Sequence, residues 1–205
     1  MLPLQENAPK MVRPGCATGI EVGQLGGCGM GLIFKISIGL GAFLFMAGTA
    51  LAQDQSTNRV AAKTDWSVFV EDNPTECWSV ATAKKSVNTR DGRVVAATRG
   101  QILLMVFYRP SADAKGQVAF TGGYPFRSGS TVNVNIKGSE FELFTEGEWA
   151  WPATKADDAK IVTAMKRGAE AVVTGISSRG TTTKDTFSLL GFTAAVEDAE
   201  GRCEG

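Results

Sequence analysis

The chain has 205 residues, with 21 Lys or Arg and 21 Asp or Glu, so its formal net charge is zero. Without an excess of positive charge, nothing in the composition favours nucleic acid as a partner. The chain has no histidine, which excludes Ser-His-Asp and Cys-His catalysis and removes the commonest metal ligand. We therefore predict no metal site and no catalytic residue of these classes.

The N-terminal part of the sequence has the three parts of a secretory signal peptide. Lys35 supplies the positive charge, Ile36 to Leu51 form an uncharged apolar run, and small residues stand at Ala50 and Ala52. The sequence turns polar directly after Ala52, as expected at a cleavage site. We interpret residues 30–52 as a signal peptide and expect the mature protein in the periplasm or outside the cell.

The alternative for this segment is an inner-membrane anchor formed by residues 31–51, which would be the protein's one membrane contact. As a helix the apolar run reaches only about 24 Å, against about 30 Å of hydrocarbon, so cleavage is favoured. Residues 1–29 contain many Pro and Gly, and Met30 makes a better start for a signal peptide. We expect residues 1–29 to be a wrongly assigned gene start or unstructured, and the polar residues 53–64 to form a flexible linker.

Two cysteines remain in the exported part of the chain. Cys16 and Cys28 precede the predicted cleavage site, whereas Cys77 and Cys203 follow it. In an oxidising compartment we expect these two to pair, which would tie the C-terminus to an early strand. The alternative is two unpaired buried thiols. A zinc site is disfavoured, because two sulfurs without histidine make half of a zinc shell.

The first half of the mature chain predicts strands. Trp66, Val68 and Val70 alternate with Ser67 and Phe69, as in a strand. A break follows at Asn73-Pro74, after which 77–83 form the partner of a hairpin. Residues 101–108 are apolar throughout, which predicts a central strand buried on both faces. A shorter strand is expected at 117–120.

The second half predicts a hairpin, a helix, two further strands and a short terminal helix. The hairpin is indicated by alternating apolar residues on both sides of Lys137-Gly138. The helix is indicated by Thr154 as a cap, acidic residues in its first turn and Lys166-Arg167-Gly168 at its end. These elements are expected at 131–144, 154–168, 169–176, 181–187 and 189–199.

The expected fold is therefore mainly β. We predict an antiparallel β-sandwich or partly open barrel with one mid-chain helix and a short C-terminal helix. It should form a single domain over residues 65–205.

Aromatic residues in two loops are candidates for a binding surface. Trp149 and Trp151 can stack on a sugar or on a partner's surface, although such residues more often pack in the core. Tyr124 and Phe126 follow two glycines and form an aromatic loop that is either an exposed contact patch or a turn that closes one end of the fold. We predict a protein or glycan partner for these four side chains.

A carboxylate cluster beside the tryptophans suggests a second function. Glu140, Glu142, Glu146 and Glu148 lie where a cell-wall or glycan hydrolase would need paired carboxyls, about 5 to 9.5 Å apart. Residues two apart on a strand share a face, however, so Glu140 and Glu142 also suit an ordinary solvated surface.

Several motifs resemble the invasion-associated locus B family of the alphaproteobacterial envelope. They are Asp65-Trp-Ser-Val68, Cys77 on the second strand, Ala164-Met-Lys-Arg-Gly168, and above all Phe187-Ser-Leu-Leu-Gly-Phe192 with the small residues that follow. The chain departs from the family pattern at Phe69, where members carry a cysteine, and at Glu146 to Trp151, where they often have another pair. The resemblance covers nearly all of the predicted domain. It implies a periplasmic or surface-associated protein, linked in host-associated bacteria to entry into host cells, with no established catalytic activity and no cofactor.

Overall fold

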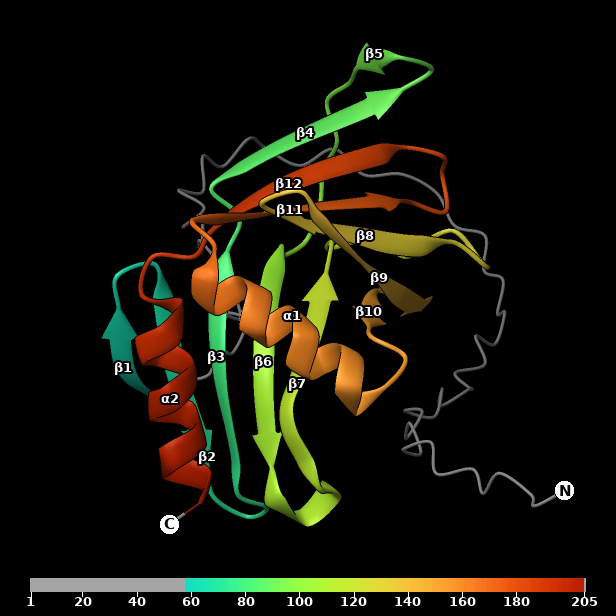
Figure 1. Cartoon of the computed structure of the whole chain (residues 1–205). Coiled ribbons are helices and arrows are strands. Elements are labelled where there is room, and N and C mark those ends of the chain that lie inside the picture. The colour runs from blue at the N-terminus through green and yellow to red at the C-terminus, as the bar shows by residue number, and fades with distance from the viewer. Residues whose placement is uncertain (1–57, 205) are drawn as a thin grey trace, which may run out of the picture. The chain divides into compact units, whose positions relative to one another are not determined.

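The computed structural model describes residues 58–204, so the predicted signal peptide, the segment before it and the start of the linker lie outside the described residues. This part of the chain forms twelve strands, two α-helices and a short 3-10 helix (Figure 1). Neither α-helix within 58–204 has the length and apolar character needed to cross a membrane. The strands are β1 (Arg59–Lys63), β2 (Trp66–Glu71), β3 (Glu76–Thr82), β4 (Lys85–Arg90), β5 (Arg93–Val94), β6 (Leu103–Arg109), β7 (Ala114–Thr121), β8 (Thr131–Ile136), β9 (Ser139–Glu146), β10 (Trp149–Trp151), β11 (Glu170–Ile176) and β12 (Thr182–Ser188). The helices are η1 (Pro110–Ala112), α1 (Lys155–Arg167) and α2 (Phe192–Cys203).

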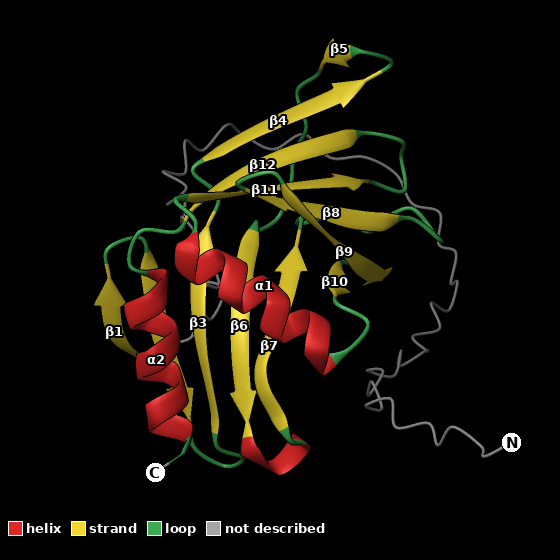
Figure 2. Cartoon of the chain, in the orientation of Figure 1, coloured by secondary structure: helices red, strands yellow, loops and turns green. Residues whose placement is uncertain are grey.

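All twelve strands belong to one open sheet, in the order β1-β2-β3-β6-β7-β10-β9-β8-β11-β12-β4-β5, and neighbouring strands are antiparallel. Strands β3, β6 and β7 run across the direction of β8, β11 and β12, and both α-helices lie on one side of the first group (Figure 2). The prediction of a mainly β, antiparallel fold with a mid-chain helix and a C-terminal helix is confirmed. The strands form one curled sheet.

The curl brings the far strands of the sheet back to the first ones. Only Ala83 and Lys84 separate β3 from β4, although β4 pairs with β12 near the other end of the strand order. The Lys84 N–H donates to the carbonyl oxygen of Thr186 at 2.8 Å. The indole N–H of Trp66 on β2 donates to the carbonyl oxygen of Ser188 at 3.0 Å. The end of β12 therefore lies against β2, and the enclosed side holds the core.

Inward side chains from both parts of the sheet meet in this core. On β8, Val132, Val134 and Ile136 are at most 2% exposed, as their alternation predicts. Phe120 on β7 meets Phe187 on β12 edge-on, with ring centroids 6.1 Å apart. This contact joins strands that are far apart in the sheet, so burial of apolar surface stabilises the curl.

Two polar segments form strands that the sequence did not predict. Residues Arg59–Lys63 were expected in the flexible linker but form β1, which pairs with β2. Residues Lys85–Arg90 and Arg93–Val94 form β4 and β5 on either side of Asp91-Gly92. Their pairing uses backbone groups that polar and apolar residues supply equally, so no apolar alternation marks them.

Helix α1 has the ends that its sequence predicts. The Thr154 side chain accepts a hydrogen bond from the backbone N–H of Asp157 at 3.2 Å, and Gly168 caps the helix after its last residue, Arg167. On its inner side, Asp158 accepts a hydrogen bond from the Val118 N–H at 2.8 Å, in a part of β7 beyond its pairing with β10. Burial raises the pKa of the Asp158 carboxyl. Helix α1 thus supplies a hydrogen-bond acceptor to a backbone N–H of β7 at a position where β10 does not pair with it.

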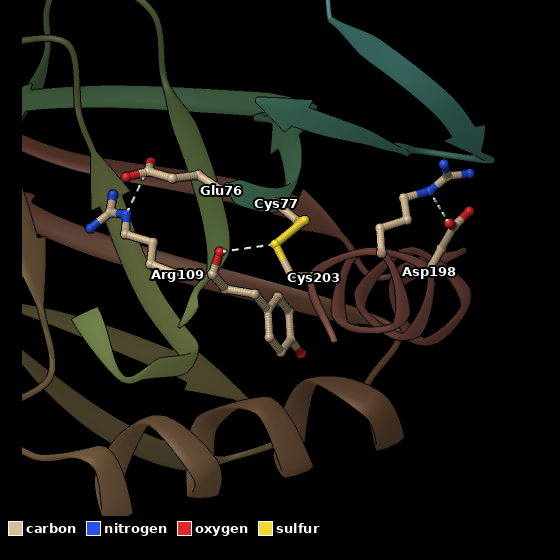
Figure 3. The surroundings of a disulfide bond; sticks show 7 residues. Glu76, Cys77, Arg109, Asp198 and Cys203 are labelled. Carbon is tan, nitrogen blue, oxygen red and sulfur yellow. Dashed lines mark hydrogen bonds and ion pairs between the residues drawn. A yellow bond between two sulfur atoms is a disulfide. The ribbon is translucent and has the colours of Figure 1, made fainter. Parts of the chain in front are cut away.

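A disulfide joins β3 to the last residue of α2. Cys77 and Cys203 are 126 residues apart in sequence, with 5.8 Å between their Cα atoms. Figure 3 shows the bridge beside the ion pair of Glu76 and Arg109, whose Oε2 and Nε atoms are 3.2 Å apart. The pairing expected from the cysteine count is present, and it closes α2 onto the sheet.

Gly191 allows α2 to begin against the backbone of β1. Its φ is +87°, and a Cβ there would lie 1.9 Å from the carbonyl oxygen of Lys63. We expect Gly191→Ala to lower the free energy of unfolding by about 3 kcal/mol, because the left-handed backbone and the steric overlap both oppose it. Urea unfolding measures the change.

The matched control is Gly201→Ala in the same helix, since no atom lies within 4 Å of its Cβ position. Alanine is the better helix former, so this variant should gain about 0.5–1 kcal/mol. Equal effects of the two substitutions would show that the contact with Lys63 is unimportant.

Candidate functional site

A cavity of about 550 Å³ lies where β4, the segment before β6, the loop after β7 and the β11–β12 turn meet. Its volume falls within the range of about 300–1,000 Å³ that is usual for small-molecule sites. Most of its lining side chains are polar or charged. The lining residues are Asn88, Arg90, Val95, Ala96, Ala97, Thr98, Arg99, Gly123, Tyr124, Pro125, Glu148, Ser177, Ser178, Arg179, Thr181 and Thr183.

Arg99 lines the cavity and forms a buried ion pair with Asp185, which lies behind the lining. The Nη1 and Nη2 atoms of Arg99 donate to the two carboxylate oxygens of Asp185 at 2.7 and 2.6 Å, and the two side chains are 6% and 0% exposed. Arg99 also donates through Nε to the carbonyl oxygen of Gly122 at 2.8 Å. Ser86 donates to Asp185 at 2.7 Å. The hydrogen bonds of this pair connect β12, β4 and the loop after β7. Asp185 also neutralises the charge of Arg99.

Tyr124 is fixed over this pair. Its ring lies 5.0 Å from the Arg99 guanidinium, and its hydroxyl is 2.5 Å from the hydroxyl oxygen of Thr183. Burial, opposed by the Thr183 hydrogen bond, raises the pKa of Tyr124. Gly123 has a φ of +69°, and a Cβ there would lie 2.6 Å from the backbone of Gly100, so only glycine lets the two segments cross. The loop that holds Tyr124 is therefore rigidly placed.

Two further arginines line the cavity from different turns. Arg90 stands at the end of β4 and donates from Nη2 to the Thr181 hydroxyl at 2.7 Å. Arg179 lies in the turn between β11 and β12, where the Ser178 N–H donates to the carbonyl oxygen of Pro125 at 2.9 Å. Both arginines are exposed, so they are accessible to a ligand.

The four aromatic residues predicted to bind a partner are placed differently from one another. Tyr124 lines the cavity, Trp149 is 37% exposed and Phe126 is 6% exposed, and Trp151 is half-buried. The Phe126 N–H donates to the carbonyl oxygen of Gly147 at 2.8 Å, so the Tyr124 loop and the turn before Trp149 lie side by side. Phe126 packs in the core against Phe120 and is not available to a partner.

The four glutamates of the proposed hydrolase cluster do not gather in this cavity. All four are exposed, and Glu148 is the one carboxylate among the lining residues. Glu140 faces Asn135 across the hairpin, with 3.5 Å between Oε1 and Nδ2. The two-carboxylate arrangement that glycoside hydrolysis requires is thus absent from the cavity wall. Residues 58–204 contain no group of three or more acidic or cysteine side chains that could hold a metal ion.

Sequence reasoning missed the arginines of the cavity. Arg90, Arg99 and Arg179 are far apart in sequence and belong to no common motif. One local signal was present, because Arg90 and Arg93 flank an Asp-Gly turn and so face each other across two strands. Like charges in that position oppose strand pairing, which points to a role other than folding.

These features define a single mainly β domain, closed by a disulfide and carrying a polar, arginine-lined cavity. The family model described as invasion associated locus B (IalB) protein matches residues 66–200. This match covers well over half of the chain, and the chain belongs to the IalB family, which is not known as an enzyme family. No curated protein and no solved structure matches the chain.

Proposed function

We propose that this chain is an exported protein of the cell envelope, periplasmic or surface-associated, that acts as a non-catalytic binding module. The observation that carries the proposal is the cavity of about 550 Å³ with Tyr124 on its wall. The partner is a protein or glycan of the envelope or of a host surface.

The arrangement of the cavity supports binding rather than catalysis. The side chains of Arg99 and Asp185 are occupied by hydrogen bonds to each other and to the protein. Neither group is therefore available as an acid or base. Glu148 has no second carboxylate beside it in the lining. The cavity has the volume of a small-molecule site, and the exposed Trp149 directly after the adjacent turn offers an aromatic surface to a partner.

Export is supported by the disulfide. The Cys77–Cys203 bridge would not persist in a reducing cytoplasm. We expect intact-mass spectrometry of the protein from the periplasm to give a mass that begins at Gln53. That mass should be unchanged by alkylation without reductant, because no free thiol remains. A retained N-terminal segment or two alkylated thiols would contradict export with cleavage.

Binding is tested by a photo-crosslinking residue placed at position 149 in living cells. We expect Trp149 replaced in this way to form a discrete crosslinked species, because Trp149 is exposed beside the Tyr124 loop. Position 190 is the matched control, since Leu190 is 60% exposed between β12 and α2. Equal crosslinking at both positions, or none at position 149, would contradict the proposed surface.

A further inference from the structure

We propose that the cavity binds an acidic sugar of the hexuronic acid class, whose carboxylate is held between Arg90 and Arg179. This inference rests on the proposed binding function and names its ligand class. It depends on which charges in the cavity are already neutralised and on the groups that surround them.

The first step is the charge of the cavity wall. Arg99 is neutralised by Asp185 at 2.6 Å, so its charge is not available to a ligand. None of the ion pairs formed among residues 58–204 includes Arg90 or Arg179. Glu148 is the single acidic lining residue. The remaining lining charge is therefore positive, although the net charge of the whole chain is zero.

The second step is the position of Arg90. In the β4–β5 turn, Asp91 and Gly92 have φ values of +51° and +73°, a conformation that makes Arg90 and Arg93 direct cross-strand neighbours. Two like charges in that position repel each other unless an anion lies close by. The hydrogen bond from Arg90 to Thr181 directs its guanidinium over the cavity. An anion bound there would relieve the repulsion.

The third step is the position of Arg179. Its turn is held at three points, by Ser178 N–H to Pro125, Gly180 N–H to Ser177, and Thr181 N–H to the Ser177 hydroxyl at 3.1 Å. The turn is therefore firm, and Arg179 reaches the cavity from the turn that leads into β12, the strand that pairs with β4. Arg90 and Arg179 therefore line the same cavity from adjacent elements, and a guanidinium group is well suited to pair with a carboxylate.

The fourth step concerns the rest of the ligand. Hydroxyl and amide side chains around the arginines offer both donors and acceptors, which suits a ligand with several hydroxyl groups. The Tyr124 ring and the small residues of 95–97 add apolar area for the carbon face of a sugar ring. The polar groups are Asn88, Thr98, Ser177, Ser178, Thr181 and Thr183.

The inference is tested by calorimetric titration of the exported protein with glucuronate, glucose, inorganic phosphate and phosphatidylglycerol vesicles. We expect glucuronate to bind at least about tenfold more tightly than glucose, which lacks the carboxylate. We expect Arg90→Gln/Arg179→Gln to weaken glucuronate binding by about tenfold or more. Arg59→Gln is the matched control, because it removes one exposed arginine on β1 and should leave binding unchanged. Thermal unfolding of each variant checks its fold, and Arg179→Gln alone, in an exposed turn, replaces the double variant if that fails to fold.

Equal binding of glucose and glucuronate would overturn the inference, and so would unchanged binding by the folded arginine variant. Tighter binding of phosphate or of the vesicles than of glucuronate would also overturn it, by assigning the site to a free anion or a lipid headgroup. If crosslinking at position 149 persists while glucuronate does not bind, the ligand class is wrong and the binding function stands. If crosslinking also fails, the proposed function itself is contradicted.

Discussion

Replacing Cys77 and Cys203 together by alanine should lower the free energy of unfolding by about 5 kcal/mol. The bridge closes a loop with a sequence separation of 126 residues, and cross-linking so long a loop removes many conformations from the unfolded chain. The bridge also holds the last residue of α2 against β3 (Figure 3). Since typical domains have only about 5–15 kcal/mol of stability, this loss would leave the variant close to unfolded. Denaturant unfolding of both proteins measures the difference.

Reduced wild-type protein is the control for this prediction. It keeps both sulfurs and lacks only the bond, so it should be destabilised about as much as the double alanine variant. A reduced protein as stable as the oxidised one would show that the bridge contributes little. A large loss in the alanine variant alone would assign the effect to packing of the sulfurs.

We expect Asp185→Asn to destabilise the protein by about 4 kcal/mol, because it leaves the Arg99 guanidinium buried without a counter-charge. Arg99 and Asp185 are 6% and 0% exposed at their side chains, so water cannot replace the lost carboxylate. The substitution also changes the acceptor of the Ser86 hydroxyl. Urea unfolding at neutral pH measures the loss.

The double variant Arg99→Leu/Asp185→Leu should recover part of this loss, since removing both charges leaves none unpaired. The matched control is Asp113→Asn, whose partner Lys155 is 72% exposed and whose own side chain is 79% exposed. Solvent screens that pair, so its loss should not be measurable. If Asp185→Asn and Asp113→Asn behave alike, the buried pair does not stabilise the fold as argued.

The local elements of this domain could be predicted from the sequence because short-range patterns carry them. The β8–β9 hairpin follows from alternation around Lys137-Gly138, whose positive φ values suit the tight turn. Helix α1 follows from the Thr154 cap and the glycine at 168. The cysteine pairing followed from a count of two after the predicted cleavage site. Each of these depends on neighbouring residues or on composition alone.

The start of helix α2 could not be predicted from local sequence patterns. The tail was expected to be helical from residue 189, whereas α2 begins at Phe192 and continues to Cys203. Gly191 sets the start, because its left-handed backbone lies against Lys63 of β1. That contact joins residues far apart in sequence, so no window around the helix contains it.

The tertiary structure decided the remaining strands and the whole cavity. Strands β1 and β4 form because β2 and β12 offer free backbone partners, and β5 forms because β4 offers one in turn, not because their side chains alternate. Phe126 became a core residue once the chain closed over it.

The sequence by itself determined a mainly β domain of the IalB type with a disulfide and two helices, since alternation, caps and motifs are local. Only the folded chain brought Arg90, Arg99 and Arg179 to one cavity and gave Arg99 its partner Asp185. The physical reason is that a charged residue in a polar segment has the same sequence signature whether it faces solvent or a site. Its role depends on which distant segments surround it after folding.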